Sequence, residues 1–131
     1  MSAYFVTSTG TDIGKTFVTA GLIRYLREAG QAVDALKPVV SGFNPSVVET
    51  SDPAVLLAAL GRPVAADEVE RIAPWRFRAP LSPDLAAARE GRSIDFGQLI
   101  AFSRQAIDAA TGRPSAASST AGSLVSTTEE L

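Results

Sequence analysis

The stretch Ser8-Thr9-Gly10-Thr11-Asp12-Ile13-Gly14-Lys15-Thr16 decides the fold expected for this chain. It follows a short apolar run, Tyr4-Phe5-Val6, which predicts a buried strand, and it opens a segment with apolar residues at helical spacing. A strand, a loop of small residues, Gly-Lys-Thr and a helix are the parts of a phosphate-binding cradle, because backbone N–H groups and the helix N-terminus attract anions. In such a cradle Lys15 reaches the outer phosphates and the Thr16 hydroxyl can bind Mg²⁺.

The loop departs from the strict pattern at its beginning. That pattern has a glycine five residues before Gly14, where this chain has Thr9. A variant of the loop is one residue longer, and its first glycine would fall at Ser8. A side chain at a position with positive φ costs on the order of 1 kcal/mol, which is tolerable. The stretch therefore still indicates nucleotide binding.

Composition limits the chemistry that the chain can perform. Its 131 residues make one domain, and a net charge of −2 without a basic stripe argues against nucleic-acid binding. The absence of cysteine and histidine excludes disulfides, thiol catalysis and imidazole catalysis, so a metal would need oxygen ligands, which favours Mg²⁺. Neither a signal-peptide pattern nor a membrane-length apolar run is present, and we expect a cytoplasmic protein with small-molecule partners.

The order of predicted elements indicates an α/β fold, with a parallel sheet and flanking helices. We expect strands over residues 4–7 and 32–36, and helices over 15–29, 53–60, 83–89 and 95–110. Residues 39–50 and 62–78 are expected to be mainly loops. The apolar residues at helical spacing in the first helix, which we expect to form its buried face, are Val18, Leu22, Tyr25, Leu26 and Ala29.

The end of the chain differs in kind from the rest. Nine of the 21 residues from 111 to 131 are Ser or Thr, and no periodic apolar face is present. We expect residues 1–110 to form a partial nucleotide-binding domain, and residues 111–131 to be a disordered, low-complexity tail without a strand. With only two strands before the tail, the predicted sheet is incomplete at its C-terminal end.

Three residues beyond the loop are candidates for chemistry. Lys37 follows the second strand, at the sheet edge where ligands of open α/β sheets bind, and could face a phosphoryl or carboxylated group. Asp52 has two interpretations that are compatible with each other. Either Asp52 or Ser51 is a helix N-cap before Pro53, and the Asp52 carboxylate could complete the Mg²⁺ shell begun by Thr16. Ser41, before Gly42, is by its position more typical of a turn.

Four segments together resemble the dethiobiotin synthetase family. They are residues 9–16, the run Lys37-Pro38-Val39-Val40-Ser41-Gly42, the pair Ser51-Asp52, and Ala79-Pro80-Leu81-Ser82-Pro83 with Ala86-Ala87. The resemblance covers residues 3 to about 110, and its most specific part is the run that begins at Lys37. It implies a P-loop NTPase-like parallel sheet and an ATP-dependent cyclo-ligase of biotin biosynthesis, which carboxylates 7,8-diaminononanoate and closes the ring of dethiobiotin.

The resemblance also implies a role for each candidate residue. Lys37 would be the catalytic lysine, Ser41 would contact the substrate, and Thr16 and Asp52 would hold Mg²⁺. The residues that would bind ATP are Thr11, Asp12, Ile13, Gly14, Lys15, Thr16 and Asp52. The family is homodimeric.

The chain departs from that family near residue 111. Family members continue into an apolar strand that ends in Glu-Gly-x-Gly-Gly, whose glutamate is another Mg²⁺ ligand, and we expect a truncated or frame-shifted product here. One alternative is a non-catalytic P-loop fragment. Another is a partitioning-type ATPase, whose loop has a lysine where this chain has Gly10, and a third is a related amide-forming synthase, against which the segment 37–42 argues.

Overall fold

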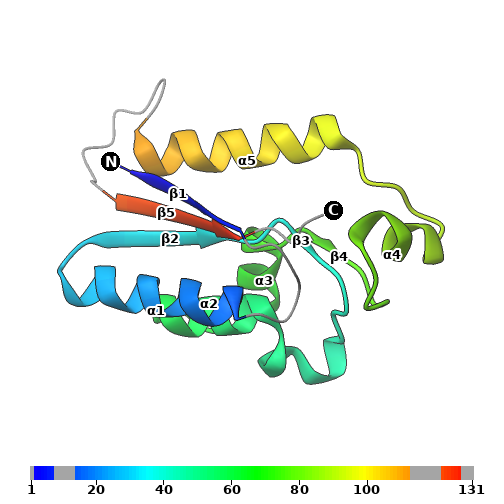
Figure 1. The fold of residues 1–131 in the computed structure, drawn as a ribbon, viewed down its shortest axis with the longest axis horizontal. Coiled ribbons are helices and arrows are strands. Elements are labelled where there is room, and N and C mark those ends of the chain that lie inside the picture. The colour runs from blue at the N-terminus through cyan, green and yellow to red at the C-terminus, as the bar shows by residue number, and fades with distance from the viewer. Residues whose placement is uncertain (1, 8–13, 113–121, 128–131) are drawn as a thin grey trace.

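The computed structural model describes residues 2–7, 14–112 and 122–127 of the chain. Figure 1 shows its elements, which are β1 (Ala3–Val6), α1 (Lys15–Glu28), β2 (Ala32–Leu36), β3 (Val39–Val40), a 3₁₀ helix (Pro45–Thr50), α2 (Asp52–Leu60), α3 (Ala66–Ile72), β4 (Trp75–Arg76), α4 (Pro83–Arg89), α5 (Phe96–Thr111) and β5 (Gly122–Thr127). No described helix combines the length and the apolar character that crossing a membrane requires.

The main sheet has three parallel strands in the order β1-β5-β2. Pairing of β5 with β1 runs from Ala3↔Leu124 to Val6↔Thr127, and pairing with β2 runs from Ala32↔Gly122 to Leu36↔Ser126. β5, which comes last in the sequence, therefore lies between β1 and β2, the two strands nearest the N-terminus (Figure 1). A second, two-stranded parallel pair joins β3 to β4. This is the α/β architecture with a parallel sheet that the sequence predicted.

The strand β5 corrects one expectation. Residues 111–131 were expected to contain no strand, yet residues 122–127 form β5 and residue 111 belongs to α5. Three of the six residues in β5 are Ser or Thr, whereas a strand in the middle of a parallel sheet usually has a near-continuous apolar sequence. The composition therefore did not indicate this strand, which pairs with a neighbouring strand on each side. The division into 1–110 and 111–131 remains a prediction.

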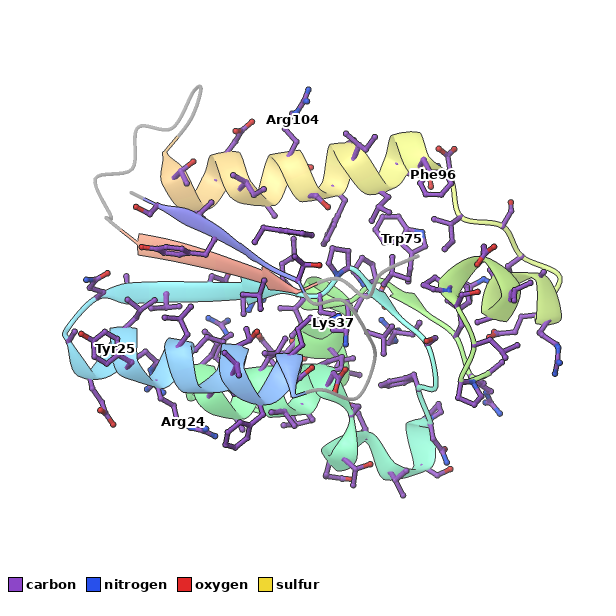
Figure 2. The ribbon with its side chains drawn as sticks, in the orientation of Figure 1. Arg24, Tyr25, Lys37, Trp75, Phe96 and Arg104 are labelled. Atoms are coloured by element: carbon purple, nitrogen blue, oxygen red, sulfur yellow. The ribbon has the colours of Figure 1, made fainter. Side chains whose placement is uncertain are left out.

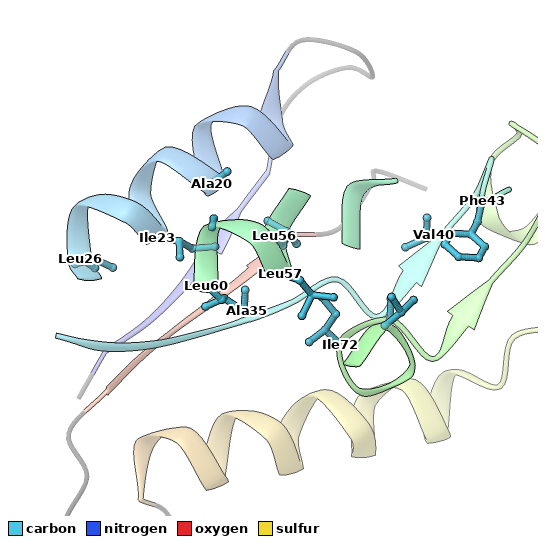
Figure 3. Packing of buried hydrophobic residues seen from close by; sticks show 13 residues of the cluster. Ala20, Ile23, Leu26, Ala35, Val40, Phe43, Leu56, Leu57, Leu60 and Ile72 are labelled. Carbon is cyan, nitrogen blue, oxygen red and sulfur yellow. The ribbon is translucent and has the colours of Figure 1, made fainter. Parts of the chain in front are cut away.

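Helices cover both faces of the main sheet. α1 and α2 pack together on one face and α5 lies on the other (Figure 1). The larger hydrophobic core cluster fills the space between α1, α2, α3 and β2, and Figure 3 shows Ile23, Leu57 and Ile72 among its members. All three are fully buried, with 0% of their surface exposed. The core therefore lies on the α1 side of the sheet.

The buried face of α1 differs from the predicted one. The buried residues are Thr19, Ala20, Ile23 and Leu26. Val18 and Tyr25 are instead 61% and 68% exposed, and of the five predicted positions Leu26 alone is buried. The predicted face and the observed buried face lie side by side on the helix. α2 packs against the observed face, whose smaller side chains let the two helices approach closely.

Short elements occur within the segments expected to be loops. Residues 39–50 contain β3 and the 3₁₀ helix, and residues 62–78 contain α3 and β4. α3 begins after Ala65 without a side-chain cap, so the usual start signal is missing, but its Val69 and Ile72 reach the core three residues apart. Tertiary packing, more than local sequence, defines this helix.

An apolar groove lies between α5 and the face of the main sheet that α5 covers. None of the residues of α5 is buried, and Phe96 and Ile100 are more than half exposed. The groove has a volume of about 740 Å³, and Phe5, Thr7, Pro38, Val39, Leu99 and Ile107 are among the residues that line it. It opens beside the ends of β1 and β2, next to the residue that follows Lys37.

Candidate functional site

The start of α1 supplies the first part of the site. Gly14 is the N-cap of α1 and has a φ of 90°, a conformation that costs an L residue about 1–2 kcal/mol. Lys15 and Thr16, both half-buried, are the first two residues of the helix. The N-cap glycine has no side chain that could accept a hydrogen bond, and the first turn has no acidic residue. The partial positive charge at the start of this 14-residue helix is therefore not offset by the first residues of the helix itself. The predicted Thr11, Asp12 and Ile13 lie outside the described residues.

Thr19 contacts the backbone of Lys15, and the sequence reasoning did not identify it. Its buried hydroxyl donates a hydrogen bond to the Lys15 carbonyl oxygen, at 2.8 Å. The bond links the first turn of α1 to the second and fixes the backbone from which the Lys15 side chain extends. A threonine four residues after a lysine in a helix is the signal that could have found it.

Lys37 provides a second cation at the same edge. It directly follows β2, and its backbone N–H donates to the Ile72 carbonyl oxygen at 3.0 Å. Because Pro38 comes next, the backbone of Lys37 is biased toward an extended conformation and carries the side chain out at the end of the strand. Figure 2 places Lys37 where β1, β5 and β2 end. Its side chain is 0% exposed, which is rare for a lysine without a charged partner.

Asp52 is that partner. The Lys37 ammonium donates a hydrogen bond to Oδ2 of Asp52 and forms an ion pair with it, across 15 residues of sequence. The Asp52 side chain is 36% exposed, so the carboxylate has one side toward the buried ammonium and another toward solvent. The structure thereby joins two residues that the sequence had only placed near one edge.

The capping of α2 answers one of the two questions about Asp52, namely which residue is the N-cap. Ser51 is the N-cap, since its hydroxyl accepts from the Ala54 N–H at 3.3 Å, and Asp52 is the first residue of the helix. The acidic side chain also lies in the first turn, where the helix dipole favours it. The carboxylate is therefore available for contacts outside its own helix.

Ser41 lies in the connection after β3. It is half-buried, and the following Gly42 has a φ of 68° and donates its N–H to the Ala79 carbonyl oxygen at 3.0 Å. This bond brings the segment 37–42 beside the segment 79–83. Two of the sequence runs that carried the family resemblance are thus neighbours in the fold.

The oxygen donors at this edge match a Mg²⁺ ion that is bound together with phosphate. The described residues contain no group of three or more His, Cys, Asp or Glu side chains that could hold a metal alone. Mg²⁺ usually keeps several waters and binds one or two carboxylates plus substrate phosphates. The partly exposed Asp52 carboxylate and the Thr16 hydroxyl are each the kind of oxygen ligand that such an ion takes.

A strand followed by a left-handed glycine, Lys-Thr at a helix N-terminus and a parallel sheet with helices on both faces define a P-loop NTPase-like α/β protein. The chain belongs to the AAA domain family, whose model matches residues 2–119.

Curated relatives extend this finding. The chain is 50% identical over 113 residues to the ATP-dependent dethiobiotin synthetase BioD of Acidiphilium cryptum, and 53% identical over 112 residues to that of Methylobacterium nodulans. The alignments cover 86% and 83% of this chain, but only 51% and 50% of the relatives. A third relative, from Caulobacter sp. strain K31, is 56% identical over 76% of this chain and 42% of its own length. The predicted resemblance is confirmed, and the chain spans about half the length of these relatives.

Proposed function

We propose that the protein catalyses, or supplies the nucleotide-binding half of, the ATP-dependent conversion of 7,8-diaminononanoate to dethiobiotin. The observation that carries the proposal is the buried Lys37, paired with Asp52 at the edge where Gly14 and Lys15 open α1. Relatives about 50% identical to this chain are named ATP-dependent dethiobiotin synthetases, which supports the proposal.

The proposed chemistry needs positioning and charge neutralisation rather than an acid–base side chain. A carbamate, formed from one amine and CO₂, attacks the γ-phosphorus of ATP and ADP leaves. The second amine then attacks the carbonyl carbon, the ring closes and inorganic phosphate departs. Negative charge accumulates on the carbamate and the phosphoryl oxygens, and nearby cations lower the cost of both steps. A chain without histidine can therefore perform the reaction.

We assign the residues as follows. Lys37 acts as the catalytic lysine, because its ammonium can stabilise charge on the carbamate and the γ-phosphate. Ser41 contacts the substrate. Asp52 and Thr16 would hold Mg²⁺, which when bound would neutralise phosphate charge. The residues that bind ATP are Thr11, Asp12, Ile13, Gly14, Lys15, Thr16 and Asp52.

The apolar groove gives the substrate a place for its hydrocarbon chain. It begins at Thr7 and Pro38, beside the strand ends, and continues along α5 past Leu99 and Ile107. Diaminononanoate joins its two amines to an aliphatic acid chain, so a polar reaction centre beside an apolar groove suits it. The proposal further includes a cytoplasmic location, small-molecule substrates and no nucleic-acid partner.

Phosphate release tests this function. The purified chain is incubated with MgATP, diaminononanoate and ¹³C-bicarbonate, while phosphate and the mass of the product are measured. We expect phosphate release to require both the diamine and bicarbonate, the product to carry ¹³C, and Lys37→Met to abolish both signals. Phosphate release without the diamine would contradict the ligase and indicate an ATPase.

A second candidate is a nucleotide-binding protein without turnover. The chain spans about half the length of these relatives, and the other half of a relative could supply parts of the site. MgATP binding, measured by calorimetry, without phosphate release under any condition would favour this candidate. Sedimentation of the same sample with and without nucleotide would test whether the chain forms the dimer expected from its family.

A further inference from the structure

A further cavity, of about 450 Å³, is not used by the proposed function. Its volume is in the range of small-molecule sites, about 300–1,000 Å³. Of the described residues that line it, three are arginines, namely Arg76, Arg78 and Arg92, and one, Glu90, is acidic. We call this cavity the arginine pocket. The excess of positive charge on its lining favours an anionic ligand.

The wall of the arginine pocket is apolar and carries cations at its border. The rings of Phe43 and Phe77, which are 9% and 1% exposed, contribute to it. The guanidinium carbon of Arg76 lies 5.6 Å from the centre of the Phe43 ring, and that of Arg92 lies 4.6 Å from the centre of the Phe77 ring. These contacts hold each guanidinium over an aromatic face. The pocket therefore suits a ligand that joins a hydrocarbon part to a negative group.

Backbone hydrogen bonds keep this wall in place. The Phe77 N–H donates to the Val40 carbonyl oxygen at 2.8 Å, and the Phe43 N–H donates to the Phe77 carbonyl oxygen at 2.9 Å. Figure 3 shows Val40 and Phe43 close together at one end of the core. A wall that is formed before the ligand arrives adds little ordering cost to binding.

Arg92 offers two hydrogen-bond donors to such a ligand. Its Nη1 donates to the Arg76 carbonyl oxygen at 3.2 Å and lies 3.6 Å from Oε1 of Glu90. Among the residues that the structure describes, none accepts a hydrogen bond from Nε or Nη2 of Arg92. Glu90 is committed elsewhere, since its Oε2 accepts from the Arg78 backbone N–H at 2.9 Å. The Nε–Nη2 edge of Arg92 is thus available to a ligand.

Arg62 shows what that edge of a guanidinium binds in this protein. Its Nε donates to Oε2 of Glu68 at 2.8 Å, and its Nη2 donates to Oε1 of the same carboxylate at 2.7 Å. The two parallel donors match the two oxygens of a carboxylate. Arg92 presents the same two donors beside an apolar wall, where this part of the chain supplies no carboxylate for them.

We propose that the arginine pocket binds an aliphatic carboxylate. Its two oxygens accept hydrogen bonds from Nε and Nη2 of Arg92, and its hydrocarbon chain packs against Phe43 and Phe77. The site is separate from the groove beside α5, because the described lining of the two cavities has no residue in common. The substrate and product of the proposed reaction belong to the same chemical class, but the inference does not rest on that reaction.

Calorimetric titration of the full chain with octanoate tests the ligand class. Octanoate has one carboxylate and a chain of eight carbons, and octanamide has the same length without the charge. We expect octanoate to bind at one site, and octanamide to bind about tenfold or more weakly, because hydrogen bonds from a guanidinium to a neutral amide oxygen are weaker than those to a carboxylate.

Three variants test the role of Arg92. Arg92→Gln should weaken octanoate binding about tenfold, since it removes both the charge and the two parallel donors. Arg92→Lys keeps the charge without the planar pair of donors, so its affinity should fall between the other two. Arg89→Gln is the matched control. It removes a positive charge from an exposed position in the last turn of α4, outside the pocket, and should leave the affinity unchanged.

Phenylalanine signals locate the ligand in the unchanged chain, where no substitution can disturb folding. The sequence has six phenylalanines, so ¹³C-labelled phenylalanine gives six sets of ring signals. We expect octanoate to shift the signals of Phe43 and Phe77 and to leave those of Phe5 and Phe96, which line the groove beside α5, in place. Phe5→Leu and Phe96→Leu, at exposed positions, assign the two groove signals.

Each outcome decides for or against the site. Octanoate binding that shifts Phe43 and Phe77 and weakens in Arg92→Gln supports it. Absence of binding at millimolar octanoate, equal affinities for octanoate and octanamide, or equal affinities of the unchanged chain and Arg92→Gln would overturn it. Shifts at Phe5 and Phe96 alone would assign the ligand to the other groove and also overturn it. None of these results depends on phosphate release, so the proposed function stands or fails separately.

Discussion

Lys37, at the end of β2, and Asp52, at the start of α2, form an ion pair in which the cation is fully buried and the anion is partly exposed. Removing the cation and removing the anion should therefore change the free energy of unfolding by different amounts. A buried ammonium is held by its carboxylate partner, whereas a partly exposed carboxylate is also stabilised by water. This asymmetry leads to the first prediction.

Asp52→Asn should destabilise the protein more than Lys37→Met does. We expect a loss of about 2–3 kcal/mol for Asp52→Asn, somewhat below the range for fully buried pairs, because it removes a carboxylate charge that contacts a buried ammonium. Lys37→Met keeps an unbranched side chain of similar length and should change the free energy of unfolding by less than about 1 kcal/mol. Urea unfolding at pH 7 measures both, and equal losses would contradict the asymmetry.

The buried face of α1 can be tested with two residues of the same helix. Ile23 is fully buried in the core, and Ile23→Ala should cost about 2–4 kcal/mol through lost burial and a cavity. Tyr25 is 68% exposed, and Tyr25→Ala should cost less than about 0.5 kcal/mol. Chemical denaturation compares the two. The face expected from the sequence would give a large effect at Tyr25 instead.

A cluster of charges joins α3 to its neighbours and should make stability depend on pH. Glu68 accepts hydrogen bonds from Arg62 Nε at 2.8 Å and Nη2 at 2.7 Å, and Arg71 also contacts it. The Arg62 hydrogen bonds lower the pKa of Glu68 from 4.5 to about 2. The carboxylate therefore contributes stability above pH 4.5, and this contribution is lost as the pH falls toward 2.

Glu68→Gln isolates that contribution. We expect the unchanged chain to be more stable than Glu68→Gln above about pH 5, and the difference to shrink between pH 4.5 and 2. Thermal unfolding at several pH values measures it. Glu49→Gln, at an exposed position of the 3₁₀ helix, is the matched control and should show no such pattern. A difference that grows in acid would contradict the ion pairs.

The backbone of β5 offers a test of the sheet order. Leu124 lies opposite Ala3 on β1 and Asp34 on β2, so a proline there would interrupt the hydrogen bonding of a strand that is paired on both sides. We expect Leu124→Pro to abolish cooperative unfolding, as followed by far-UV circular dichroism. Val64→Pro, in an exposed connection, should retain it. Normal unfolding of Leu124→Pro would contradict the central place of β5.

Sequence reasoning identified those parts of the site that depend on local chemistry. Lys15 and Thr16 open α1 as the motif predicted, and Lys37 follows a strand as the proline after it predicted. The contact between Lys37 and Asp52 could not be predicted, because the sequence could not decide whether Ser51 or Asp52 caps α2. That choice depends on how α2 meets the end of β2, which is a tertiary property.

The errors have a similar physical origin. β5 was missed because half of its residues are Ser or Thr, although Thr favours strands, and pairing on both sides outweighs its polar composition. The face of α1 was misjudged because Val18 and Tyr25 are apolar but lie on the solvent side of the helix. Both cases depend on which partner an element meets, and a local pattern does not contain that information.

The position of β5 between β1 and β2 has a consequence for how the protein is made. During synthesis the first strand, the phosphate-loop helix and Lys37 leave the ribosome long before residues 122–127 do, and no pairing joins the first two strands directly. Bringing together β1 and β5, which lie more than a hundred residues apart, is slow, because the entropy of the intervening chain must be lost first. The nucleotide site should therefore form after translation has passed β5, and a nascent chain halted earlier would carry the motif without the site.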